Sequence, residues 1–172
     1  MQRPSRTPAS IGNRNESPRA DAGCTHGHFA SGCTGQCALR VLIGGTDAHA
    51  KNYSLLLDGE QVRLAPLYDI SSALPYPQLQ KHKIKLAMKV GSHYRWWDIT
   101  LRDWQATATA MRLAPAVAME MLASMALELP RVAEEQRLLL EDEGIEHPVL
   151  ETLVQEIASS CQRCLSRFSS ES

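Results

Sequence analysis

The chain has 172 residues, of which 44% are hydrophobic and 22% are charged, a composition typical of a soluble globular protein with one core. No run of about 18 apolar residues occurs, which excludes a transmembrane helix. No apolar segment follows the N-terminal arginines, so a secretory signal is not expected. We therefore expect a cytoplasmic protein whose five cysteines are free thiols.

The net charge of -1 hides an uneven distribution along the chain. Residues 37–97 contain eight Lys and Arg against four acidic residues, whereas residues 98–172 contain six Arg against thirteen acidic residues. A positive field over the first of these segments suits a phosphate-rich ligand.

The N-terminal segment differs in composition from the rest of the chain. Residues 1–36 are dense in Ser, Thr, Pro, Gly, Asn and Arg and contain few large apolar side chains. Such a segment cannot bury enough surface to offset the entropy lost on ordering. The sequence therefore predicts a disordered, low-complexity tail over residues 1–36, followed by one folded domain over residues 37–168.

The first half of this domain mixes helix and strand signals. Residues 37–43 are mostly apolar and precede two glycines, which predicts a buried helix that ends at a loop. Residues 53–57 and 61–64 flank an Asp-Gly pair, which predicts a short β-hairpin. Residues 81–89 alternate between apolar and basic side chains, which predicts a strand whose basic face is more often a solvated surface than a docking site.

The second half is predicted to be helical. Thr100 and Asp103 have the spacing of a capping box, and Pro130 should break or kink the helix that contains it. All three tryptophans are expected in the core, because large aromatic side chains dominate packing. The helices are expected over residues 100–112, 115–129, 131–143 and 148–168.

Three polar residues carry the chemistry that the sequence suggests. Asp47 and Asn52 lie five residues apart, and Asp69 follows after a short apolar segment. Phosphoryl transfer needs one carboxylate that orients the attacking hydroxyl, and hard oxygen ligands that hold magnesium on the phosphates of ATP. Protein kinases use the same Asp-to-Asn interval in their catalytic loop. We therefore assign the first role to Asp47 and the magnesium to Asp69 and Asn52.

Structural roles are an alternative for the same residues. Asp47 and Asn52 could cap a turn after the glycines, because short polar side chains do this routinely. Asp69 could instead cap a helix that begins at Ile70. His49 could be a packing histidine.

The segments 45–54 and 64–69 together resemble the C-terminal domain of the HipA-type toxin kinases of bacterial toxin–antitoxin systems. Residues 86–91 and the helical tail are also similar, so that the resemblance extends over residues 37–168. It implies an α+β fold, mostly α, that corresponds to the C-lobe of a protein-kinase-like fold with a short β-hairpin and a helical C-terminal half.

The resemblance also implies an activity and partners. It implies an ATP- and Mg²⁺-dependent serine/threonine protein kinase in which Asp47 is the catalytic base and Asn52 and Asp69 are the Mg²⁺ ligands. His49 and Lys51 would have secondary roles near the transferred phosphate. The family phosphorylates an aminoacyl-tRNA synthetase and is neutralised by a DNA-binding antitoxin, so that both are implied partners, and no membrane partner is expected.

An intact kinase of this family also has an N-terminal lobe that covers the phosphates and supplies a lysine to them. No Lys precedes Lys51 in this sequence, and the glycines upstream of it lie in no strand pattern. We therefore expect a truncated kinase, or one whose N-lobe is a separate chain, with little activity by itself. The alternative is a non-catalytic kinase remnant that binds the antitoxin.

Two further hypotheses concern metal and nucleic acid. A zinc site is conceivable among the cysteines and histidines near the N-terminus, although their spacing is irregular and the surrounding sequence is polar. Cys161 and Cys164 are better explained as incidental residues of a helix. Direct nucleic-acid binding is unlikely, since no DNA-binding motif is present. The residues of the conceivable zinc site are Cys24, His26, His28, Cys33 and Cys37.

Overall fold

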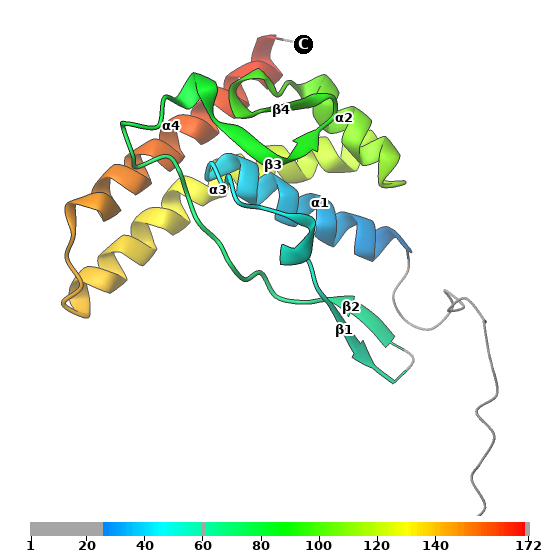
Figure 1. Ribbon diagram of the computed structural model, residues 1–172, viewed down its shortest axis with the longest axis horizontal. Coiled ribbons are helices and arrows are strands. Elements are labelled where there is room, and N and C mark those ends of the chain that lie inside the picture. Colours follow the sequence, from blue (N-terminus) through cyan, green and yellow to red (C-terminus); the bar gives the residue numbers. More distant parts are fainter. Residues whose placement is uncertain (1–25, 60, 171–172) are drawn as a thin grey trace, which may run out of the picture.

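The computed structural model describes residues 26–59 and 61–170. This part of the chain forms a mostly helical α+β fold with two short antiparallel strand pairs, which confirms the predicted fold class (Figure 1). The helices are α1 (His26–Leu42), α2 (Leu101–Ala110), α3 (Pro115–Asp142) and α4 (Pro148–Ser170). The strands are β1 (Leu55–Asp58), β2 (Gln61–Leu64), β3 (Lys85–Val90) and β4 (His93–Arg95), and the 3₁₀ turns are η1 (Ala50–Asn52), η2 (Lys81–Lys83) and η3 (Trp96–Asp98).

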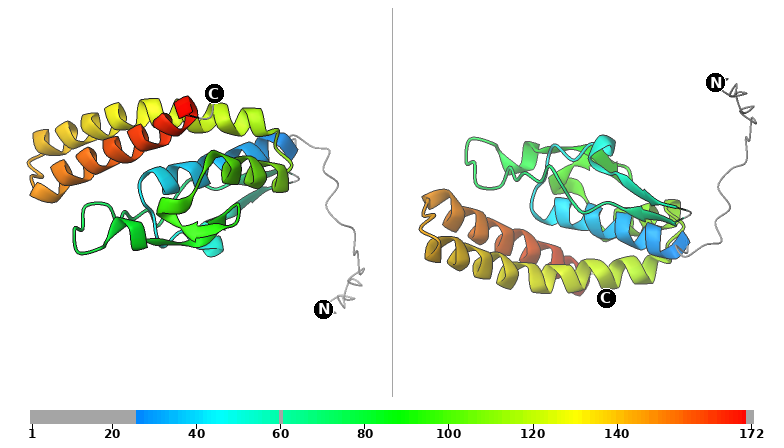
Figure 2. Two further views of the ribbon diagram at one scale, coloured as in Figure 1. Left: turned by 90° about the horizontal axis from the view of Figure 1, so that it is seen from above. Right: turned by 90° about the horizontal axis from the view of Figure 1, so that it is seen from below.

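Helix α1 lies between the strands and a pair formed by α3 and α4, which run side by side in opposite directions (Figure 2). The core is formed where α1, α2, α3, α4 and β3 meet. It is rich in aliphatic and Trp side chains, which include Leu42, Leu86, Trp96, Trp104, Leu122 and Ile157. In the described residues no helix is long and apolar enough to cross a membrane.

Helix α1 begins well before the predicted position. It starts at His26, so the prediction of disorder is wrong for residues 26–36, while residues 1–25 lie outside the described part. Ala30, Thr34 and Ala38 recur every fourth residue and are almost fully buried. These side chains are small, so the helix can approach α3 closely, as the 3.3 Å distance between Met121 Cε and an ideal Cβ at Gly35 illustrates. Close packing of this kind orders a segment whose average hydrophobicity is low.

The strands follow the predicted patterns with one difference. β1 and β2 form the predicted hairpin, with Leu55 opposite Leu64 at its open end. The strand predicted over residues 81–89 begins only at Lys85, because residues 81–83 form η2. From there the alternation holds, since Leu86 and Val90 are buried whereas the lysines at 85 and 89 are exposed.

The helical half departs from prediction at Pro130. α3 is one continuous helix across this proline, so the predicted division into two helices is wrong, while the alternative of a kink stays a prediction. Extensive packing of α3 against α4 along their length offsets the hydrogen bond that the proline removes. The capping box is confirmed, since Thr100 accepts from the backbone N–H of Asp103 and the Asp103 side chain accepts from that of Thr100.

The Asp103 carboxylate also joins α2 to β4. Besides Thr100, it accepts from His93 Nδ1 at 2.9 Å and from the backbone N–H of Ser92 at 3.2 Å. Burial would raise the pKa of this carboxyl, but the hydrogen bonds from Thr100, His93 and Ser92 outweigh burial and hold the pKa well below its usual range. Asp103 is therefore a structural carboxylate.

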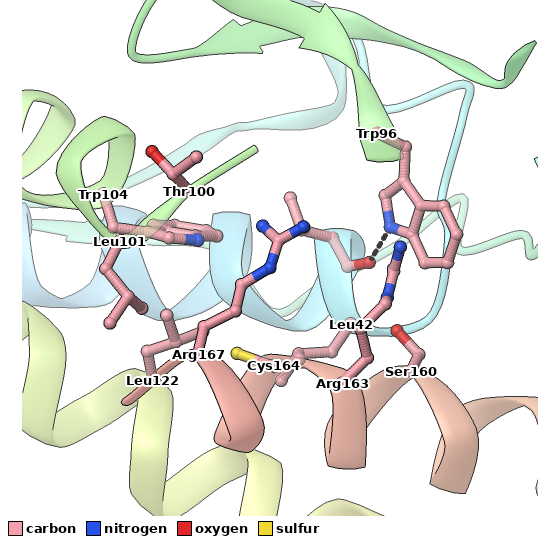
Figure 3. Close-up of a pocket in the computed structure, with 11 residues that line it drawn as sticks. Leu42, Trp96, Thr100, Leu101, Trp104, Leu122, Ser160, Arg163, Cys164 and Arg167 are labelled. Carbon is pink, nitrogen blue, oxygen red and sulfur yellow. Dashed lines mark hydrogen bonds between the residues drawn. The ribbon is translucent and has the colours of Figure 1, made fainter. Parts of the chain in front are cut away.

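A small cavity marks the junction of α4 with the rest of the fold (Figure 3). Trp96 donates through its indole Nε1 to the carbonyl oxygen of Val41 at 2.7 Å, and the Arg163 guanidinium lies 3.8 Å from the centre of the Trp96 ring. Trp96 and Trp104 are buried as predicted. Trp97 is 42% exposed, so its expected core position is wrong; its ring instead flanks the same guanidinium at 4.2 Å.

Candidate active site

The predicted catalytic loop leaves the end of α1 in a tight turn. The backbone N–H of Gly45 donates to the carbonyl oxygen of Arg40 at 2.6 Å. Gly44 has φ +64, and a Cβ at this position would lie 2.7 Å from the Leu74 side chain. A glycine is therefore required here both for its backbone conformation and for space. The turn directs Thr46 and Asp47 away from the helix and toward β3, where the backbone N–H of Ala87 donates to the carbonyl oxygen of Thr46 at 3.0 Å.

Asn52 connects the two halves of the motif. Its Nδ2 donates to the carbonyl oxygen of Asp47 at 3.0 Å and to Asp69 Oδ2 at 2.9 Å. Both partners are acceptors, so the amide nitrogen must face them and the amide oxygen Oδ1 is left available. Asn52 is only 3% exposed, so this arrangement is fixed by its surroundings. The structure thus joins Asn52 to the Asp69 side chain and to the backbone of Asp47, whereas the Asp47 carboxylate contacts His49, so the predicted convergence of all three side chains stays a prediction.

Asp69 has an unusual backbone conformation. Its φ is +52, in the left-handed region that residues other than glycine rarely adopt. Aspartate tolerates this region better than most residues, and such conformations are concentrated at functional sites. The backbone of Asp69 is held by Arg40, whose Nη1 donates to the carbonyl oxygen of Asp69 at 3.2 Å.

A second group of hydrogen bonds fastens the loop to the segment that precedes Asp69. The Tyr68 hydroxyl donates to the carbonyl oxygen of Lys51 at 2.6 Å and lies 2.7 Å from Ser54 Oγ. On the other side, Ser72 Oγ donates to the carbonyl oxygen of Ile43. Both ends of the motif are therefore attached to the same scaffold.

The side chains with predicted secondary roles lie on the exposed side of the loop. His49 Nε2 is 2.7 Å from Asp47 Oδ1, so the imidazole and the carboxylate form a pair. Both side chains are largely open to solvent, at 47% and 63%. Lys51 is exposed on η1, next to Asn52, and its proposed contact with phosphate stays a prediction.

The donor set fits a hard divalent cation. The Asp69 carboxylate and the free amide oxygen of Asn52 are the oxygen ligands that Mg²⁺ prefers, and such sites are usually completed by water and phosphate oxygens. The described residues contain no group of three or more His, Cys, Asp or Glu that could hold a metal by themselves. A site of this kind would therefore bind Mg²⁺ together with a phosphate ligand rather than as a closed protein cage.

The four cysteines within the described residues are set up to stay protonated. Cys33, Cys37, Cys161 and Cys164 are free thiols. Burial raises the pKa of Cys37 to about 11 and that of Cys161 to about 12, which disfavours the thiolate. Cys161 and Cys164 lie in α4 as predicted. Part of the hypothetical zinc site lies outside the description, namely Cys24 and the side chains of His26 and His28.

Arg40 is a further candidate among the described residues, and the sequence predictions did not include it. Arg40 is 3% exposed, and its guanidinium donates to backbone carbonyls of both halves of the motif. The signal was available, because a lone arginine within the apolar residues 37–43 of a buried helix requires buried acceptors.

Comparison with known proteins finds a matching family. The model of the HipA-like C-terminal domain matches residues 31–133. The chain belongs to this family. It is 37% identical over 68 residues to a protein of Sinorhizobium fredii (strain NBRC 101917 / NGR234) named "Putative kinase Y4mE", a match that covers 40% of this chain and 16% of the relative.

The fold of the HipA-like domain is also found in a solved structure. A chain of the complex of HipA, HipB and operator DNA from the Shewanella oneidensis MR-1 toxin–antitoxin system superposes with a TM-score of 0.68 at 20% identity. The match covers 84% of this chain and 37% of that chain. The HipA-like chain described here therefore spans well under half the length of both proteins.

Proposed function

We propose that this HipA-like domain is the catalytic-loop half of an ATP- and Mg²⁺-dependent serine/threonine protein kinase of a toxin–antitoxin system. The observation that carries the proposal is the double hydrogen bond of Asn52, which holds the Asp47 loop and the Asp69 carboxylate at one point. A turn cap needs only the first of these bonds. The second brings a carboxylate from a distant segment beside a free amide oxygen, which is an arrangement suited to a metal bound to phosphate.

The residues have distinct tasks in the proposed reaction. An acceptor hydroxyl attacks the γ-phosphorus of ATP, the new P–O bond forms as the bond to ADP breaks, and the hydroxyl proton passes to Asp47. His49 orients the Asp47 carboxylate through their 2.7 Å contact. Asn52 Oδ1 and Asp69 would hold Mg²⁺, which when bound supplies positive charge against the phosphates. Lys51 would approach the transferred phosphate from η1.

The partners of this kinase are proposed by analogy with the family. The acceptor is a Ser or Thr of a protein, for which an aminoacyl-tRNA synthetase is the first candidate. The regulator is a DNA-binding antitoxin, in line with the structural neighbour that was solved with HipB and operator DNA. The lobe that covers the ATP phosphates would come from another polypeptide or another segment, and the assembly would work in the cytoplasm.

Nucleotide binding tests the proposal directly. We expect the purified chain to bind a fluorescent ATP analogue in the presence of Mg²⁺ and to lose most of this binding in EDTA. Asp69→Asn should weaken the Mg²⁺-dependent binding by at least about tenfold, because the variant keeps the side-chain shape but not the charge. Asp58→Asn, which removes an exposed carboxylate from β1, is the matched control. An affinity for the ATP analogue that changes neither in EDTA nor in Asp69→Asn would refute the metal site.

A non-catalytic binding module is the second candidate, and one observation favours it. An apolar cavity of about 650 Å³ opens between α1, the β1–β2 hairpin and β3, lined by Phe29, Leu55, Leu64, Met88 and Met111 among others. An apolar cavity of this volume is suited to anchoring apolar side chains of a protein partner. Retention of antitoxin binding by a chain that binds no Mg²⁺–nucleotide would favour this candidate over the kinase.

A further inference from the structure

Arg40 is a buried cation whose described polar contacts are all with neutral groups. Its Nη2 donates to the carbonyl oxygens of Asn52 at 3.3 Å and Tyr68 at 3.0 Å, while Nη1 donates to the carbonyl oxygen of Asp69 at 3.2 Å. Its guanidinium also lies 5.3 Å from the centre of the Tyr53 ring. None of the ion pairs among the described residues includes Arg40.

Burying a guanidinium without a carboxylate is unfavourable, so the arrangement needs a compensating gain. The Nε of Arg40 is also buried without a partner in the described structure, which adds to the cost. An apolar side chain of similar size would fill this space without either penalty. The favourable contribution of Arg40 is therefore its set of three carbonyl contacts and the Tyr53 ring.

The three carbonyls belong to the two segments that must meet at the site. One is that of Asn52, at the end of the catalytic loop, and the others are those of Tyr68 and Asp69. The guanidinium is planar and rigid, so its forked donors fix the distance between these two backbones. The same two segments are also joined by Asn52 Nδ2, which donates to Asp69 Oδ2 at 2.9 Å.

The fork also supports the unusual backbone of Asp69. Two of its three bonds are made to the carbonyl oxygens of the two peptide units that flank the Cα of Asp69, where φ is +52. Without these bonds the segment can relax toward a commoner conformation, and the carboxylate would then turn away from Asn52.

We propose that Arg40 is a positioning residue that sets the separation and orientation of Asn52 and Asp69 for Mg²⁺ and phosphate. This inference rests on the function proposed above. Arg40 acts through the backbone and does not touch the metal or the nucleotide.

Two substitutions separate this role from a general contribution to folding. Arg40→Lys keeps the charge and length but cannot span both segments with a rigid fork. The matched control is Arg163→Met, which removes a second partly buried guanidinium, stacked on Trp96 at 3.8 Å and remote in sequence from the loop (Figure 3). Both variants are expected to lower the melting temperature.

The decisive readout is the Mg²⁺-dependent affinity for the fluorescent ATP analogue, measured below the melting temperature of each variant. We expect Arg40→Lys to weaken it by about 10- to 100-fold, as is usual when a group that orients a metal ligand is lost. Arg163→Met should leave the affinity unchanged. Equal affinities for wild type and Arg40→Lys, or equal losses in both variants, would overturn the inference.

A second measurement does not depend on ligand. Exchange of the Asn52 side-chain amide protons, followed by NMR, should be slow in the wild type and in Arg163→Met but fast in Arg40→Lys, because the Asp69 acceptor moves. Unchanged slow exchange in Arg40→Lys would overturn the positioning role. A wild type with slow exchange but no Mg²⁺-dependent binding would instead refute the proposed function, and Arg40 would then only order the loop.

Discussion

Asn52 uses both of its amide protons within the protein, one on the carbonyl oxygen of Asp47 and one on the carboxylate of Asp69. At the scale of single residues this bond pair determines the shape of the site, since each partner comes from a different segment. A buried amide that loses its partners costs about 1 to 3 kcal/mol, and a buried charge costs more. Asn52 is the donor and Asp69 the acceptor in their hydrogen bond. This assignment can be tested by swapping the two residue types, so that position 52 carries Asp and position 69 carries Asn.

We expect Asn52→Asp to lower the free energy of unfolding by about 1 to 3 kcal/mol, because the buried position 52 would then hold a carboxylate that faces the exposed Asp69 carboxylate and the carbonyl oxygen of Asp47. Combining it with Asp69→Asn should restore much of the loss, since the new amide can donate to the new carboxylate. Urea unfolding of the four proteins forms a double-mutant cycle that measures the coupling. Additive effects would mean that the two side chains do not contact each other.

The predictable part of the site was its choice of side chains. Asp47, Asn52 and Asp69 could be grouped from the sequence because phosphoryl transfer requires a base and oxygen ligands. The role of Arg40 could not be assigned, because its partners are backbone carbonyls, and every residue has one. The left-handed backbone conformation of Asp69 could not be predicted from the sequence either, because it depends on hydrogen bonds from Arg40 in the distant helix α1.

At the scale of elements, local signals were reliable and packing effects were not. The β1–β2 hairpin, the capping box of α2 and the start of α4 at Pro148 follow from turn and cap chemistry within a few residues. The early start of α1 and the continuity of α3 instead depend on contacts between helices. A low average hydrophobicity predicted disorder at residues 26–36, although small side chains at every fourth position were sufficient for docking.

Because α3 continues through Pro130, replacing this proline should change the free energy of unfolding. In a continuous helix it removes the hydrogen bond to the carbonyl oxygen of Ala126 and strains the backbone, at a cost of about 3 kcal/mol. We therefore expect Pro130→Ala to raise the free energy of unfolding by about 1 to 3 kcal/mol, measured with urea. Pro115→Ala, at the first helical position where proline is favourable, is the control and should have no such benefit. Similar small effects at both positions would indicate that α3 is interrupted at residue 130.

At the scale of the whole molecule, charge and shape divide the chain into two faces. The segment with excess positive charge, residues 37–97, contains the candidate site, and the acidic helices follow it. The α1 helix separates the strands from the α3–α4 pair, so the site lies on the side away from that pair (Figure 2).

Several exposed leucines of β1, with Leu57 at 75%, lie on the hairpin that follows the predicted catalytic loop. A two-stranded hairpin with this much exposed apolar surface is marginal by itself and suits a position at an interface.

The superposition with the Shewanella HipA complex covers only 37% of the chain of that structure, which bears on the turnover expected of this chain by itself. Phosphoryl transfer depends on groups that clamp the phosphates from both sides, and losing one such group typically costs about 100- to 1000-fold in rate. The proposed site would supply a base and two metal ligands, which form one side of that clamp. We therefore expect the purified chain to bind Mg²⁺–nucleotide but to transfer phosphate from labelled ATP to protein acceptors no faster than its Asp47→Ala variant. Addition of a separately produced N-terminal lobe of a HipA-type kinase should raise the rate for the wild type alone. Turnover by the unassisted chain that disappears in Asp47→Ala would contradict this expectation, because it would mean that the residues described here complete the clamp themselves.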